Sequence, residues 1–144
     1  MEASYLLGGF MDKIEKAFVE LEMSRYLIYK KEIDVERERI LNMSPPPPDG
    51  MPRGNATSNV TEQKAIKLIE STAILSMQRV VDAIDRVLAR SNVIQRQIFK
   101  MHYIQGRRDY YRMCDDLHIS YPTFMRYKKI LIDSVATELG IKRY

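Results

Sequence analysis

Residues 109–131 read Asp-Tyr-Tyr-Arg-Met-Cys-Asp-Asp-Leu-His-Ile-Ser-Tyr-Pro-Thr-Phe-Met-Arg-Tyr-Lys-Lys-Ile-Leu and hold two short helical patterns, which meet at Leu117–Ser120. Cys114 lies on the apolar face of the first pattern, and Ile119 supplies an apolar plug for the corner. Ser120 is a favourable N-cap for the second pattern, whose second residue is a proline. The stretch therefore predicts a helix-turn-helix, a unit that places its second helix in the major groove of DNA.

A third helical pattern, over Val93–Tyr103, precedes this unit. Ser91-Asn92 can cap it, and Gly106 can end it. Its spacing places four apolar residues toward the core, namely Ile94, Ile98, Phe99 and Met101. Residues 91–144 are thus expected to form a three-helix DNA-binding module whose last helix runs over Tyr121–Leu139.

The N-terminal segment, residues 1–42, has no glycine or proline between residues 11 and 41, which predicts one long helix there. Apolar residues recur in it at intervals of seven, at Ile14, Leu21, Ile28 and Val35. The companion positions are mostly charged, so the two-residue seam of a coiled coil is incomplete. Two interpretations are open: a solvated helix that docks one stripe on the rest of the protein, and a helix for oligomerisation or partner contact.

Residues 43–60 contain four consecutive prolines and predict a semi-rigid linker. A second long helix is expected over residues 61–90, capped by Thr61 or Asn59. Its apolar face follows three-and-four spacing and comprises Ile66, Ile69, Ala73, Met77, Val80, Ile84 and Val87. The predicted fold class is therefore all-α: a long N-terminal helix, a Pro-rich linker, a second long scaffold helix and the C-terminal module.

The charge is distributed unevenly along the chain. The net charge is +4 over 144 residues. Residues 1–59 carry 8 Lys and Arg against 10 Asp and Glu, whereas the rest of the chain carries 15 against 9. The basic excess therefore belongs to the C-terminal part, as expected for a DNA-binding module.

Few residues offer the chemistry of catalysis or metal binding. Cys114 is the single cysteine, and the two histidines, His102 and His118, do not form a zinc-ligand pattern with it. Asp115-Asp116 point about 100° apart on a helix, so they do not form an acid and base at one site and are expected to pair with arginines or to cap. We therefore expect no enzyme, no metal and no cofactor. The lone cysteine, with no secretion signal or membrane span evident, favours a reducing cytoplasm.

The last helix supplies the expected base-reading residues. If Phe124 lies in the core, the same side of the helix holds Tyr127 or Lys128, Leu131 and Val135. The outward face then carries Tyr121, Pro122, Met125, Arg126 and Lys129. Arg126 is the principal candidate, because its planar guanidinium can bond guanine twice. The alternative is an ordinary solvated helix face, and the preceding corner favours the DNA interpretation.

Phosphate contacts are expected where the unit meets the DNA backbone. The candidates are Arg107, Arg108 and Arg112 near the start of the first helix of the unit, and Ser120, Thr123 and Lys128 on the second. Of Tyr110 and Tyr111, one is expected in the core and one outside. Lys100 and Arg96 either extend the basic surface or serve solubility.

Two resemblances follow from these residues. Leu117-His-Ile-Ser-Tyr-Pro-Thr123 is similar to the corner in the promoter-binding fourth region of bacterial sigma factors. Met113–Ser120 with Thr123, and Glu138-Leu-Gly140, more narrowly resemble the RinA/ArpU family of phage late-gene transcriptional regulators. Asn59–Ala65 and Asp82–Asp85 fit the central segment of that family. The resemblance implies an activator of a phage operon for packaging, virion assembly and lysis.

Three functions are therefore considered. The leading hypothesis is a sequence-specific transcriptional regulator that binds double-stranded DNA, acts with RNA polymerase and forms a homo-oligomer, with a dimer favoured. The alternative is the DNA-recognition subunit of a phage packaging machine, similar to a small terminase. The third is an adaptor that binds RNA polymerase or another protein through its acidic first half.

Overall fold

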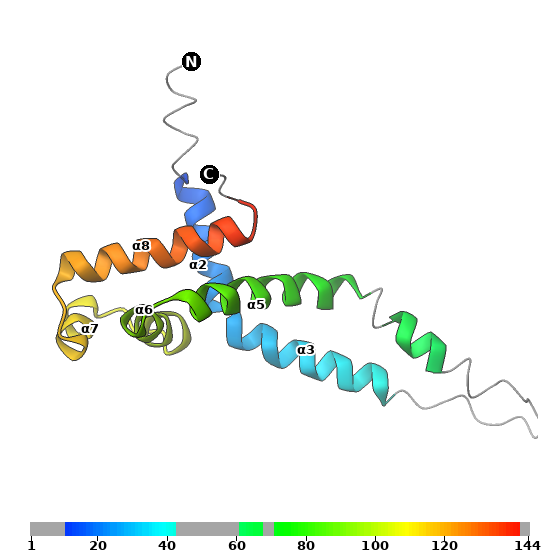
Figure 1. Cartoon of the computed structure of the whole chain (residues 1–144). Helices are drawn as coiled ribbons and strands as arrows, with labels where there is room; N and C mark the ends of the chain where they lie inside the picture. Colours follow the sequence, from blue (N-terminus) through cyan, green and yellow to red (C-terminus); the bar gives the residue numbers. More distant parts are fainter. Residues whose placement is uncertain (1–10, 43–60, 68–70, 142–144) are drawn as a thin grey trace, which may run out of the picture.

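The computed structural model describes residues 11–42, 61–67 and 71–141. The regular structure of these residues is helical, with no strand, which confirms the all-α prediction. The elements are α2 (Lys13–Ser24), α3 (Tyr26–Leu41), α5 (Thr72–Arg90), α6 (Val93–Ile98), the π-helix η1 (Phe99–Ile104), α7 (Tyr110–Leu117) and α8 (Tyr121–Glu138). In Figure 1, α3 lies along α5, α8 crosses α2, and α7 lies near the start of α8. The predicted linker, residues 43–60, lies outside the described residues.

The predicted single helix over residues 11–41 is wrong, because the chain bends at Arg25 and forms α2 and α3 instead (Figure 1). Arg25 has φ −90° and ψ 2°, and its N–H is shared between the carbonyls of Leu21 and Glu22. The bend lets each half pack on a different neighbour, α2 on α8 and η1, and α3 on α5. The tertiary contacts therefore override a sequence that has no local helix breaker.

The stripe of apolar residues predicted for this segment does not face the rest of the chain. Ile14, Leu21, Ile28 and Val35 are all exposed. The buried residues of α2 and α3 are Val19, Glu22, Met23, Tyr26, Ile33 and Ile40. This segment does pack on the rest of the protein, but along α3 it does so through a second series of residues at intervals of seven, Tyr26, Ile33 and Ile40.

The predicted helix over residues 61–90 is also interrupted. Residues 61–67 are helical, and α5 begins only at Thr72, where the Oγ of Ser71 accepts a hydrogen bond from the N–H of Ile74. Of the predicted apolar face, Ile84 and Val87 are buried, whereas Ile66 is 43% exposed. Residue Ile69 and the alternative cap Asn59 lie outside the described residues. The scaffold helix is therefore the shorter α5.

The segment before α7 starts and ends near the predicted positions. The Oδ1 of Asn92 accepts the N–H of Gln95 at 2.8 Å, which makes Asn92 the N-cap of α6. The second half is the π-helix η1 rather than a continued α-helix. Gly106 follows with φ +71°, a conformation that favours glycine. Of the four residues predicted to point inward, Ile98 and Phe99 are buried, and Ile94 and Met101 are half-buried.

The core joins the N-terminal and C-terminal halves. The largest fully buried side chains include Met23 of α2, Ile84 of α5, Phe99 of η1, and Phe124 and Leu131 of α8. Since these side chains come from helices far apart in the sequence, α2 helps to build the interior on which α8 rests. The orientation of α8 therefore depends on the N-terminal helix.

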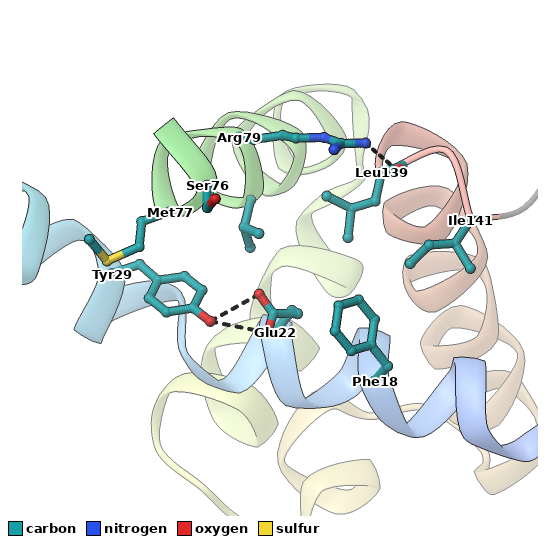
Figure 2. Close-up of a pocket in the computed structure, with 9 residues that line it drawn as sticks. Phe18, Glu22, Tyr29, Ser76, Met77, Arg79, Leu139 and Ile141 are labelled. Carbon is teal, nitrogen blue, oxygen red and sulfur yellow. Dashed lines mark hydrogen bonds between the residues drawn. The ribbon is translucent and has the colours of Figure 1, made fainter. Parts of the chain in front are cut away.

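Helix α5 also holds the C-terminal end of α8. Arg86 and Arg90 donate to the carboxylate of Glu138 at 3.0 and 2.7 Å. Arg79 donates to the carbonyl oxygen of Leu139 at 2.8 Å, as Figure 2 shows. Two of the segments quoted for the resemblance, Glu138–Gly140 and Asp82–Asp85, thus have structural roles. Glu138 and Leu139 bind α5, and the carboxylate of Asp85 accepts the hydroxyl of Tyr26.

A hollow of about 360 Å³ lies beside this contact and is lined mainly by α2, α5 and the end of α8. Figure 2 shows the side chains that line it. The carboxylate of Glu22 points into it, and the Tyr29 hydroxyl donates to both of its oxygens at 3.0 Å. Apolar side chains such as Phe18 and Ile141 make up much of the rest. The hollow lies at the C-terminal end of α8, roughly 25 Å along the helix from its start.

Candidate nucleic-acid interface

A tight turn at His118–Ser120 joins α7 to α8. His118 adopts the left-handed conformation, with φ 55° and ψ 44°, and the N–H of Ile119 returns to the carbonyl of Cys114 at 3.1 Å. The Oγ of Ser120 accepts the N–H of Thr123 at 3.3 Å, as expected for an N-cap. Cys114 is buried and Ile119 is half-buried. The turn therefore has the local geometry that the sequence predicts.

The first turns of α8 present most of the predicted base-reading residues to solvent. Tyr121, Pro122, Arg126 and Lys129 are exposed, and Met125 is half-buried. The guanidinium carbon of Arg126 lies 5.5 Å from the centre of the Tyr127 ring, a cation–π distance that leaves its donors available. On the opposite side, Phe124, Leu131 and Val135 are buried, as predicted.

Two tyrosines connect the starts of α7 and α8. The rings of Tyr111 and Tyr121 stack with centroids 5.0 Å apart and planes at 19°. Tyr111 is 73% exposed, whereas Tyr110 is half-buried and packs against Phe124. This confirms that one of the two neighbouring tyrosines lies inside and one outside. A cleft of about 310 Å³ adjoins the stack and is lined by Arg108, Asp109, Tyr110, Tyr111, Arg112 and Tyr121.

The three arginines near the start of α7 differ in their surroundings. Arg107 pairs with Asp109 at 3.3 Å and with Asp116 at 2.9 Å. The hydrogen bond from Arg107 holds the pKa of the Asp109 carboxyl below its ordinary value. Arg108 and Arg112 are exposed, and neither forms an ion pair within the described part of the chain. Arg107 thus ties the N-cap of α7 to its last turn, and the other two guanidinium groups are available to a phosphate.

The expected phosphate contact of Lys128 does not fit its position. Lys128 is only 6% exposed, its ammonium lies 3.0 Å from the Oε1 of Glu20 on α2, and it lies over the Tyr110 ring at 5.1 Å. Phe124 and Leu131 are in the core, and residue 128 lies between them on the same helix face. Lys128 is therefore an internal anchor of α8 and is turned away from the solvent face.

Glu20 is the centre of this anchor. Besides the ammonium of Lys128, its Oε1 accepts the hydroxyl of Tyr103 at 3.0 Å. Burial by itself would raise the pKa of Glu20, but the hydrogen bond and charge of Lys128 outweigh it and lower that pKa. Burial and the Glu20 carboxylate together raise the pKa of Tyr103. Sequence reasoning missed Glu20, because no local pattern connects it with residues near the opposite end of the chain.

Ser120 and Thr123 contribute mainly to the start of α8. The Oγ of Ser120 donates to the Oγ1 of Thr123 at 2.9 Å while it caps the helix. Ser120 remains exposed and Thr123 is half-buried, so the hydroxyl of Ser120 is the more accessible.

Among residues 11–42, 61–67 and 71–141, no cluster of histidine, cysteine and carboxylate side chains could hold a metal ion. None of the helices in these ranges is long and apolar enough to cross a membrane. No protein-family model matches the chain, and no curated protein or solved structure is significantly similar to it. The resemblance to phage regulators therefore remains a prediction from the residues quoted above.

Proposed function

We propose that the protein is a sequence-specific DNA-binding transcriptional regulator in which α7 and α8 act as a helix-turn-helix. The observation that carries the proposal is the tight turn at His118–Ser120 followed by a helix whose exposed face begins with Tyr121 and carries Arg126 and Lys129. A helix with a solvated basic face and an apolar face in the core fits the major groove with little rearrangement.

In this proposal α8 reads the bases. Arg126 donates two hydrogen bonds to one guanine, and Tyr121 and Met125 contact thymine methyl groups. The ammonium of Lys129, one turn further along the helix, suits a guanine edge or an adjacent phosphate. The buried anchor at Lys128 supports this role, because it fixes the rotation of α8 about its own axis and thus the direction of Arg126.

Arg108 and Arg112 supply the phosphate contacts. Both are exposed near the N-terminal end of α7, where the first helix of such a unit crosses the DNA backbone. Their contacts set the affinity and its salt dependence but carry no sequence information. Arg107 contributes less, because its charge is already shared by Asp109 and Asp116.

The biological setting proposed is the cytoplasm of a bacterium infected by a phage. It rests on the resemblance of Met113–Ser120 and Glu138–Gly140 to late-gene regulators, which implies activation of a late operon together with RNA polymerase. One DNA-binding module of this size buries roughly 600–1,000 Å² on DNA. A dimer on paired half-sites would double that contact, so we propose a homodimer.

The test is selection of binding sites from a random duplex library, followed by anisotropy titrations of the selected site and a scrambled duplex across salt concentrations. We expect a defined consensus, tighter binding to the selected site and affinity that falls steeply with salt. The variant Arg37→Ala, which removes an exposed arginine on α3, is the control. Absence of salt-dependent affinity for any duplex would refute the proposal.

A further inference from the structure

Helix α3 carries apolar side chains on two opposite faces. One face, with Tyr26, Ile33 and Ile40, is buried. The other face has no cover within the described residues, and its side chains are half exposed: Leu27 51%, Ile28 54%, Val35 55% and Leu41 57%. Four large apolar side chains in 16 residues make an apolar strip on the solvent side of one helix.

Two charged residues of opposite sign lie within this strip. With 3.6 residues per turn, Lys31 and Glu38 lie along the middle of this face, with Ile28 and Val35 on one edge and Leu27 and Leu41 on the other. Lys31 and Glu38 are exposed, and neither side chain forms a hydrogen bond or ion pair with another described residue. The cation and the anion therefore lie on opposite sides of the centre of the strip, the same number of residues away from it.

We propose that this strip binds the same strip of a second copy of the chain, with the two α3 helices antiparallel across a two-fold axis. In this register Leu27 lies opposite Leu41 of the second copy, and Lys31 lies opposite Glu38 of the second copy. Each contact occurs twice, as a symmetric interface requires. The two Val35 side chains pack near the axis.

The order of the charges along α3 favours an antiparallel partner helix, and it favours a second copy of the chain as the partner. A parallel pair in register would set Lys31 beside Lys31 and Glu38 beside Glu38, which is unfavourable. The antiparallel pair matches each charge with its opposite, so the strip is complementary to itself. Figure 1 shows the C-terminal end of α3 at the opposite side of the molecule from α7 and the start of α8. The contact thus leaves both DNA-reading faces free.

The size of the strip predicts a weak dimer. A helix of 16 residues is about 24 Å long, so a single helix pair buries less area than a standard interface of about 1,600 Å². Self-association in the micromolar range is expected. The inference builds on the dimer in the proposed function, and its test contains no DNA, so failure of the dimer and failure of DNA binding are distinguishable.

The test is sedimentation velocity of the full chain across micromolar concentrations. The wild type is expected to shift from monomer to dimer, and Val35→Glu is expected to stay monomeric because it places two carboxylates at the axis. The matched control is Leu75→Glu on α5, since Leu75 is also 55% exposed but lies outside the strip. This control is expected to dimerise like the wild type, and far-ultraviolet circular dichroism confirms that the variants stay folded.

A charge-reversal series tests the register. Lys31→Glu and Glu38→Lys should each weaken dimerisation roughly tenfold, because each creates two like-charge pairs across the interface. The double variant restores opposite charges and should dimerise nearly as well as the wild type. A wild type that stays monomeric, a dimer that survives Val35→Glu, larger assemblies, or a double variant as weak as either single one would overturn the inference.

Discussion

The ammonium nitrogen of Lys128 lies 3.0 Å from Oε1 of Glu20, and this pair ties the proposed DNA-reading helix α8 to the N-terminal helix α2. The side chain of Lys128 is 8% exposed and that of Glu20 is 28% exposed, so the cation is the more deeply buried partner. Tyr103 and Tyr110 complete the surroundings of the pair. The two halves of the chain are thus held together by a polar contact that neither half can make alone.

The first prediction concerns stability. Glu20→Gln leaves the buried ammonium of Lys128 without its counter-charge and should lower the free energy of unfolding by about 2–3 kcal/mol, less than for a fully buried pair because Glu20 is partly solvated. Lys128→Met removes the buried charge, keeps the length of the stem, and should change stability by less than about 1 kcal/mol. Urea unfolding followed by circular dichroism measures both values. Equal losses in the two variants would contradict this account.

The second prediction concerns the stability of the folded protein in acid. The pKa of Glu20 lies below its ordinary value of 4.5 despite burial, because the hydrogen bond and charge of Lys128 favour the carboxylate. The unfolded chain therefore binds more protons at Glu20 than the folded chain does. The stabilising effect of the Glu20–Lys128 pair is present above the pKa of Glu20 in the unfolded chain, and it is lost as the pH falls through the pKa of Glu20 in the folded chain. The stability difference between wild type and Glu20→Gln should shrink as the pH falls from about 6 to about 3. Glu62→Gln, an exposed substitution away from the pair, is the control. A difference that stays constant with pH would count against the ion pair.

Local rules were sufficient for the helix caps and the core face of α8 in the C-terminal part of the sequence. The caps at Asn92 and Ser120 depend on side chains three residues from the amides they bind. Burial of Phe124, Leu131 and Val135 follows from helical spacing alone. These features were predictable because the interacting groups are close in sequence.

The N-terminal part depended on contacts that spacing cannot reveal. The seven-residue series from Ile14 to Val35 is compatible both with docking on the rest of the chain and with oligomerisation, and Tyr26, Ile33 and Ile40 form a competing series with the same period. The bend at Arg25 decides between them, and it arises because α2 and α3 have different neighbours. For Lys128, helical spacing left Tyr127 or Lys128 open as the residue on the core side of α8, and only the contact with Glu20 on a distant helix decides between them.

The third prediction separates base reading from phosphate contact. Arg126→Ala should relax the preference at one base pair of the selected site and cost about 1–3 kcal/mol there. Arg108→Ala should weaken binding to all duplexes alike and reduce the slope of log affinity against log salt by about 1. Site selection and salt titrations with the two variants provide the measurement. An unchanged consensus for Arg126→Ala would show that another residue reads the bases.

The fourth prediction concerns the stacked pair Tyr111 and Tyr121. Tyr111 is 73% exposed, so Tyr111→Leu should leave the unfolding free energy nearly unchanged. It removes the ring that supports Tyr121 at the start of α8 and should weaken binding to the selected duplex by roughly 1 kcal/mol, about fivefold. Tyr111→Phe keeps the ring and should bind like the wild type. If Tyr111→Phe is as weak as Tyr111→Leu, the hydroxyl contacts the DNA and the stack is not the cause.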